Sequence, residues 1–266
     1  MAYVWIMEDT HKTLRGGSFG NTLQGLQDDQ ALLVVEFLAS FHAQYIAHDS
    51  VLAEFSEILF DSRSFLSLVG QTLQKKLSDL PDLALKLQMR LEPEFVHSLQ
   101  YVSEKFEDLV DYAHKKLPCA VLHGDVQPEA FYFCEEEVVA SEWQQATVSF
   151  AGLDLASFFV QCLSLSSRRK HYTAWMQRYL DLLLDIADPH NTEGLDLIVL
   201  DRSFKVGLAV LLSKLTVSAL GSPLSTVEQV SSTKKLLARA QAAAIDFRLD
   251  TFLNKLDLQS SQPDYF

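Results

Sequence analysis

The chain has 266 residues, of which 48% are hydrophobic and 21% are charged, a composition typical of a globular protein with a sizeable core. It carries 22 Lys and Arg against 35 Asp and Glu, which gives a formal net charge of −13. This acidic balance opposes non-specific association with nucleic acid or anionic lipid, so we expect neither nucleic-acid nor membrane partners. The 10 glycines offer few positions for glycine-rich phosphate loops.

The cysteine pattern and the N-terminal residues bear on the cellular compartment. Three cysteines without a C-x-x-C pair argue against a disulfide framework and against a thiolate zinc site. The N-terminus lacks the basic leader and the apolar length of a signal peptide, and we expect no window with the ~18 apolar residues that a membrane helix needs. We therefore expect a cytoplasmic protein.

In chain order, the pattern begins with a short strand and continues with helices. Residues 3–7 are β-branched or aromatic and end at an acidic pair, which is typical of a buried strand. Residues 10–27 are rich in glycine and polar side chains and predict an irregular connection. Apolar residues at helical spacing then predict helices over residues 31–48, 51–60, 64–77, 83–89 and 93–116.

The middle of the chain has a different texture. Short β-branched and aromatic runs separated by turn residues predict strands over residues 119–123, 130–134, 138–140 and 147–150. Helical spacing returns at Leu153 and predicts helices over residues 172–186, 195–220 and 225–256, and the last residues, 259–266, are expected to fray. The fold class is therefore α+β: a mostly helical body with one small β insertion.

Within the β insertion, His123 and Asp125 flank a glycine directly after the first strand. A carboxylate at the end of a rigid strand can orient an attacking hydroxyl, which is what phosphoryl transfer requires. The same tripeptide also suits an ordinary turn in which the aspartate bonds to its own backbone.

Further motifs follow in a fixed order. Residues 142–144 read E-W-Q at a strand end, and residues 152–159 read G-L-D-L-A-S-F-F at the start of a helix. The order resembles choline-kinase-like and aminoglycoside-phosphotransferase-like small-molecule kinases, and most of all the ecdysteroid kinase-like (CHK) group, with its HGDxxxxN, I-D-F/W and G-x-x-x-DLA-x-F motifs. Residues 6–9 are similar to the hinge strand of that group, and residues 39–43 to its A-x-x-H-A helix.

The resemblance covers about residues 1–255 and implies a protein-kinase-like C-lobe. Asp125 would be the base or hydroxyl-orienting carboxylate, His123 would brace the catalytic loop, and Asp154 would pin that loop from the following helix. Three residues would offer their backbone to the adenine of ATP: Met7, Glu8 and Asp9. The C-lobe would span residues 1–258, divided into a hinge-like strand and loop (1–27), a helical part (28–117), the catalytic-loop β region (118–150) and a second helical part (151–258).

The sequence departs from the family pattern at the metal positions. The Asn of HGDxxxxN falls at Ala130, which has no ligand atom, and the strand-end Asp, the principal magnesium ligand, falls at Glu142. Because magnesium demands tight octahedral geometry, the extra methylene at Glu142 displaces the carboxylate. Glu129 is a possible substitute, although a solvated surface glutamate is the plainer interpretation. The hinge-like strand also begins at residue 3, so we expect the N-lobe to be absent.

Two other features favour structural interpretations. Residues 16–20 (G-G-S-F-G) match parts of a nucleophile-elbow motif and of a kinase glycine loop, but without the flanking elements of either, which favours an ordinary loop. The basic run at residues 168–171 predicts a solvated helix start or a contact for a phosphate or an acidic partner. His42 is expected to be a packed helix residue.

The resulting hypothesis is a degenerate, pseudokinase-like binding or scaffold module with no cofactor, whose partner is a small molecule or another protein. One alternative is an active phosphotransferase that uses ATP and magnesium to phosphorylate a hydroxyl of a small molecule such as a steroid or an amino alcohol. Another is a binding module for a small apolar ligand, without chemistry.

Overall fold

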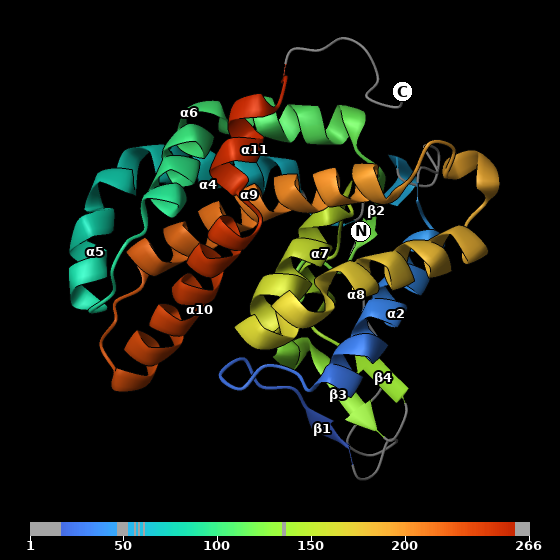
Figure 1. Cartoon of the computed structure of the whole chain (residues 1–266), viewed down its shortest axis with the longest axis horizontal. Coiled ribbons are helices and arrows are strands. Elements are labelled where there is room, and N and C mark those ends of the chain that lie inside the picture. The colour runs from blue at the N-terminus through green and yellow to red at the C-terminus, as the bar shows by residue number, and fades with distance from the viewer. Residues whose placement is uncertain are drawn as a thin grey trace.

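The computed structural model describes residues 17–46, 53–55, 57, 59–60, 62–134 and 137–258. The chain is mostly helical and carries two small antiparallel sheets (Figure 1), in agreement with the expected α+β class. The expected hinge-like strand with Met7, Glu8 and Asp9 and the tail at residues 259–266 lie outside the described residues.

Helical periodicity located most helices to within a few residues. The α-helices are α2 (Asp28–Ala43), α4 (Ser62–Lys76), α5 (Leu80–Lys86), α6 (Pro93–Lys116), α7 (Gly152–Ser157), α8 (Leu165–Ile186), α9 (Leu197–Gly221), α10 (Val227–Asp246) and α11 (Leu249–Lys255). Short 3-10 turns are η1 (Leu77–Asp79), η2 (Pro128–Ala130), η3 (Trp143–Gln145) and η5 (Pro189–Asn191), and η4 (Phe158–Cys162) is a π-helical turn. Side chains cap the later helices: Asp196 accepts two backbone N–H bonds at the start of α9, and Thr226 begins a capping box on α10.

The expected helix over residues 225–256 is wrong in one respect, because it is two helices. α10 ends at Asp246 and α11 begins at Leu249, and between them Arg248 has φ 48° and ψ 49°. A left-handed residue cannot continue a right-handed helix. No glycine or proline marks the break, so the usual sequence signal for a helix end is missing there.

The four strands expected between residues 119 and 150 are present and belong to two sheets. β2 (Cys119–Leu122) pairs antiparallel with β5 (Thr147–Phe150), and β3 (Phe131–Cys134) pairs on one side with β4 (Glu137–Ala140) and on the other with β1 (Ser18–Phe19). β1 lies in the segment that we expected to be an ordinary loop; two residues are too short for a strand pattern. Gly17 permits its close approach, since a Cβ there would lie 2.2 Å from the carbonyl oxygen of Phe133.

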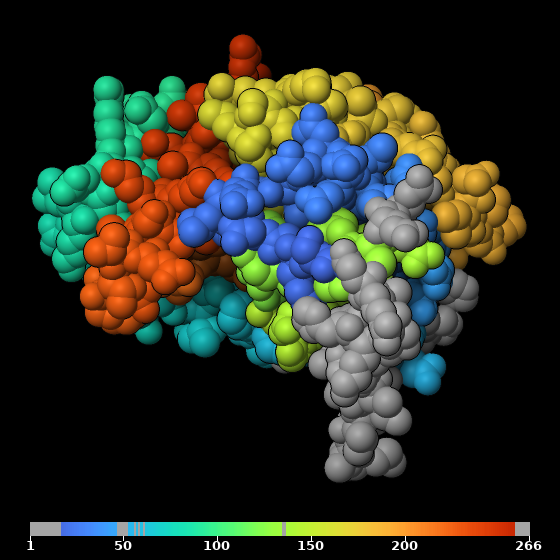
Figure 2. Space-filling view, turned by 90° about the horizontal axis from the view of Figure 1, so that it is seen from below, coloured from blue at the N-terminus to red at the C-terminus, as the bar shows by residue number. Residues whose placement is uncertain are grey.

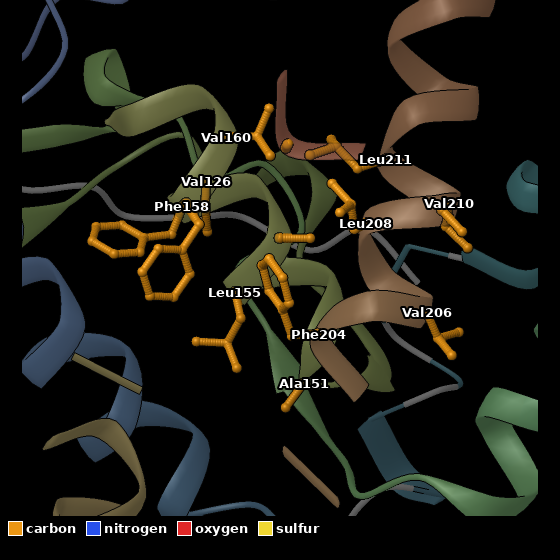
Figure 3. Close-up of a cluster of buried hydrophobic side chains, with 14 of the residues drawn as sticks. Val126, Ala151, Leu155, Phe158, Val160, Phe204, Val206, Leu208, Val210 and Leu211 are labelled. Carbon is orange, nitrogen blue, oxygen red and sulfur yellow. The ribbon is translucent and has the colours of Figure 1, made fainter. Parts of the chain in front are cut away.

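α9 runs through the centre of the helical body and packs against α4, α6, α7 and α10 (Figure 1). Its apolar side chains leave the helix in several directions. In Figure 3, Leu208 and Leu211 point toward α7, whereas Val206 and Val210 lie on the opposite side of the helix. All four are buried, so α9 is apolar around most of its circumference, as expected of a core helix.

The composition of α9 corrects one expectation from the sequence. By length and composition the helix could span a membrane, although we expected no such window. Within the protein, 61% of its most apolar 18-residue window is buried. Packing of α9 inside the helical body therefore accounts for its hydropathy.

The basic run at residues 168–171 is a solvated helix start only in part, because Arg169 and Lys170 are exposed whereas Arg168 is not. Arg168 is fully buried, and its guanidinium donates to Asp246 on α10 at 2.9 Å. His171 lies 2.8 Å from a carboxylate oxygen of Asp28, the first residue of α2. The run thus joins α8 to two neighbouring helices through carboxylates of the same chain.

The N-terminal segment, residues 17–27, lies between α10 (orange-red) and the β3–β4 region (yellow-green) in Figure 2. The Gly20 N–H donates to the carbonyl of Phe131 at 3.2 Å, and the Leu26 N–H donates to that of Cys162 at 2.7 Å. The Arg239 guanidinium of α10 donates to the Thr22 carbonyl at 2.9 Å. Residues far apart in the sequence therefore hold this segment beside the candidate catalytic loop.

Candidate functional site

The candidate catalytic loop, residues 123–127, leaves the end of β2 and passes close to the turn before β5. Gly124 has φ +82°, in the left-handed region, and a Cβ there would lie 2.0 Å from the carbonyl oxygen of Gln145. Both the backbone conformation and the close approach therefore require glycine. The glycine of the H-G-D motif is thus explained by local geometry.

Asp154, in the first turn of α7, holds this loop through its backbone. One carboxylate oxygen accepts the His123 N–H at 2.7 Å, and the other accepts the Gly124 N–H at 3.0 Å. The carboxylate is almost completely buried. Burial opposes its ionisation, but the hydrogen bond from His42 and the neighbouring histidines outweigh this effect and hold the pKa of Asp154 below its ordinary value.

His42 extends this network across two helices. Its Nε2 lies 3.2 Å from Asp154 and its Nδ1 lies 2.7 Å from the hydroxyl of Tyr179 on α8. Burial raises the pKa of Tyr179 far above its ordinary value, so the phenol keeps its proton. The imidazole thus bridges the Asp154 carboxylate and a neutral hydroxyl group. The sequence placed His42 in the helix core but did not indicate this contact.

His123 braces the loop from the other side. The ring is fully buried, and its Nε2 lies 2.7 Å from the carbonyl oxygen of Ser141. Its Nδ1 accepts the backbone N–H of Asp125 at 3.3 Å. The Trp143 ring lies 4.7 Å from it, centroid to centroid. The imidazole therefore joins the loop to the turn after β4 and is not directed at solvent.

Asp125 presents a partly buried carboxylate that is already hydrogen-bonded. Two amide groups donate to the same oxygen, Oδ2, from Gln127 at 3.4 Å and from Gln145 at 3.3 Å. Burial raises the pKa of Asp125, and the ammonium group of Lys214 opposes this rise. A raised pKa favours proton acceptance, which is the chemistry of a general base.

The structure does not gather the predicted metal ligands around Asp125. The Glu129 carboxylate accepts the backbone N–H of Thr22 at 2.6 Å and also bonds the hydroxyl of Thr22. Glu142 is exposed, has a left-handed backbone with φ 61°, and accepts the Gln144 amide at 3.0 Å. Ala130 is fully buried. Across the described part of the chain, no group of three or more His, Cys, Asp or Glu side chains is placed to hold a metal ion.

A small cavity of about 30 Å³ adjoins the loop. Gly124 and Gln145 form the wall nearest Asp125, and Phe65 and Leu211 contribute apolar surface. Lys214 of α9 supplies the one cationic side chain among the described residues of the wall. The cavity can therefore offer the Gln145 amide and an ammonium group to a small ligand, whereas Asp125 is not among the residues of its wall.

Sequence reasoning brought His123, Asp125 and Asp154 together correctly but missed their supporting side chains. Gln127 stands two residues after Asp125, so its proximity was available from the motif itself. Gln145 and Lys214 lie 20 and 89 residues after Asp125, and they belong to no motif. Their part in the site depends on how η3 and α9 pack.

Comparisons with known proteins identify what the chain is similar to. The sequence profile of the ecdysteroid kinase-like family matches residues 3–189. Among solved structures, the chain is similar to an aminoglycoside phosphotransferase from Alicyclobacillus acidocaldarius subsp. acidocaldarius DSM 446, with 15% identity, a TM-score of 0.47, and coverage of 90% of this chain and 70% of that one. No curated protein matches the chain. Because the family profile covers well over half of the sequence and the family's H-G-D and D-L-A motifs meet in one hydrogen-bonded loop, the chain belongs to the ecdysteroid kinase-like family.

Proposed function

We propose that the chain is a kinase-like module that binds a small molecule and has lost most or all of its phosphoryl-transfer activity. The described helical body would be the counterpart of a kinase C-lobe. The observation that carries this proposal is the arrangement at the two metal positions, Ala130 and Glu142, and at their possible substitute, Glu129: a buried methyl group and two engaged glutamates stand in place of magnesium ligands.

Magnesium fits these side chains poorly. It needs near-octahedral oxygen ligands at about 2.1 Å, and in phosphoryl transfer it neutralises the charge on the phosphates. Ala130 offers no oxygen, and Glu129 is committed to the N-terminal segment. The net charge of −13 adds repulsion toward a nucleotide unless a metal offsets it. The residues at these positions therefore do not fit a bound magnesium ion.

One observation favours the alternative of an active phosphotransferase. The loop retains Asp125, and Asp154 holds its backbone with two hydrogen bonds. In such an enzyme Asp125 would accept the proton of a hydroxyl on a small molecule. In a binding module, the same loop would contact the bound small molecule.

The test is ATP turnover by the purified chain with millimolar magnesium and a panel of hydroxylated small molecules. We expect the wild type to turn over ATP no faster than Asp125→Ala, and we expect ATP with magnesium to leave the melting temperature unchanged. A ligand at 100 times its Kd would add about 2.7 kcal/mol to stability, a shift that melting experiments detect readily.

A restored metal site provides the matched control. The double substitution A130N and E142D reinstates both family ligands, and Asp tolerates the left-handed backbone at position 142 better than Glu. With folding checked by circular dichroism, we expect this variant to bind Mn²⁺ more tightly than the wild type. Magnesium-dependent turnover in the wild type that disappears in D125A would overturn the proposal.

A further inference from the structure

Lys214 is the side chain of the site that the family motifs leave unexplained. It lies on α9, beyond the region that the family profile matches. Its Nζ lies 5.6 Å from the centroid of the Phe65 ring, and both residues line the small cavity beside Gly124 and Gln145. A cation therefore faces a cavity whose other walls are largely apolar.

A second lysine on the same helix shows what Lys214 lacks. Lys205 also lies 5.6 Å from an aromatic centroid, that of Phe252, and it forms an ion pair with Asp201 at 2.7 Å. Among the residues that the structure describes, no carboxylate lies within ion-pair distance of Lys214. The two lysines thus share a helix and an aromatic neighbour but differ in their counter-ion.

The carboxylates that act on Lys214 from a greater distance are engaged elsewhere. Asp125 accepts the amides of Gln127 and Gln145, and Asp154 accepts two backbone N–H groups and the His42 ring. Burial lowers the pKa of Lys214, and the charges of Asp125 and Asp154 offset this effect only in part. A ligand with a negative charge would supply a closer partner.

Two hydroxyl groups in the wall are already engaged within the protein. The Thr147 hydroxyl donates to the Phe60 carbonyl at 2.8 Å, and the Ser62 hydroxyl donates to the Val148 carbonyl at 3.4 Å. A hydroxyl has one proton to donate, so both are used inside the protein. An ammonium group has three donors, and an incoming oxygen can meet them.

The size of the cavity limits what can enter. A volume of about 30 Å³ holds about two water molecules, since each needs roughly 10 to 15 Å³. A carboxylate is smaller than a phosphate and suits so small a volume better.

We infer that this cavity binds the carboxylate of a small hydroxylated acid, with Lys214 as its counter-ion. The inference deepens the proposed function, because it names the ligand class of the same site. It disfavours amino alcohols, because their ammonium group would meet Lys214.

Three probes of one chain length test this specificity: 4-hydroxybutanoate, 1,4-butanediol and 4-aminobutan-1-ol. Binding to the full chain, without nucleotide, is followed through the backbone amide resonance of Gly124. We expect the acid to bind saturably and at least about tenfold more tightly than the diol or the amine, as for a charge-assisted hydrogen bond. The substitution K214M removes this preference, whereas K205M leaves it intact.

Probe binding tests this inference, whereas ATP turnover tests the proposed function, so the failure of one can be told from the failure of the other. Equal affinity for the three probes, no saturable binding of the acid, or an acid preference that survives K214M would overturn the inference. K214R keeps the charge and should therefore retain the preference for the acid. Loss of this preference in both K214R and K214M would also count against a counter-ion role. Circular dichroism of each variant confirms that it is folded.

Discussion

The buried carboxylate of Asp154 shows how much of the site depends on one side chain. It accepts two backbone N–H bonds from the catalytic loop and faces the His42 ring, which in turn bonds Tyr179. The loop, α2, α7 and α8 therefore meet at a single group. The Asp154 carboxylate therefore fixes the relative positions of these elements as well as stabilising them, because its buried hydrogen-bond partners would have no acceptor without it.

Asp154→Asn should therefore destabilise the chain by about 2 to 4 kcal/mol, since a neutral amide can accept from only one of its two terminal atoms and brings two donors into a buried site. Denaturant unfolding at neutral pH measures this. The Gly124 amide should also lose protection from hydrogen exchange, because its acceptor is the second carboxylate oxygen. A change below 0.5 kcal/mol, roughly that of a surface substitution, would contradict the buried network.

The stability difference between wild type and D154N depends on pH, and its pH dependence follows from the direction in which the pKa of Asp154 is shifted. The folded pKa of Asp154 lies below its ordinary value of 3.8, so its ionised form stabilises the fold above that pH. The contribution is lost as the pH falls from 3.8 through the folded pKa. The stability gap between wild type and D154N should therefore narrow under acid conditions.

Residue-scale prediction from the sequence succeeded where the chemistry is local. His123 and Asp125 are two residues apart, and Asp154 belongs to a motif with a fixed place after the hairpin, so the resemblance could bring them together. Lys214 has no such signal, because its role comes from the packing of α9 beside the loop. The contact of Glu129 with Thr22 had no such signal either, because the two residues are more than one hundred positions apart.

At the scale of elements, the contact between α8 and α10 concentrates on one carboxylate. Asp246 accepts from the fully buried Arg168 at 2.9 Å and from the exposed Arg169 at 2.8 Å. The two arginines are neighbours in the sequence but differ in solvation. Loss of the shared carboxylate would leave a buried guanidinium without its counter-charge, which is the costly case for an ion pair.

Asp246→Asn should accordingly destabilise the chain by about 3 kcal/mol, measured as a lower denaturant midpoint with an unchanged slope. Arg169→Ala is the matched control, because it removes the exposed partner of the same carboxylate and should change stability little. If the two variants lost equal stability, burial of Arg168 would not be the cause.

Helices and strands were predictable to the extent that their signals are local. The boundaries of α6 (residues 93–116) and β5 (residues 147–150) agree with the sequence patterns, since apolar spacing and turn residues mark both. The break at Arg248 was not predictable, because only its left-handed backbone ends α10. β1 was missed for another reason: two residues gain strand geometry only from pairing with β3.

At the scale of the whole molecule, Arg239 joins parts of the chain that are far apart in sequence. Its guanidinium donates to the carbonyl of Thr22 at 2.9 Å and to that of Gln161 at 2.8 Å. Thr22 in turn holds Glu129, next to the catalytic loop. A C-terminal helix thereby fixes the N-terminal segment, and that segment fixes the glutamate that would otherwise be available near the site.

Arg239→Met tests this connection, since it keeps the apolar stem and removes the donors. We expect the Gly20 and Leu26 amides to exchange at least about tenfold faster with solvent, because opening of the segment requires less free energy when its guanidinium contacts are lost. The Gly124 amide, bonded to Asp154, should keep its exchange rate and serves as the internal reference. Uniform acceleration at all three amides would indicate global destabilisation, and unchanged rates would show that pairing with β3 alone holds the segment. Selective acceleration would place the position of Glu129 under the control of α10, which explains why its carboxylate is unavailable to a metal.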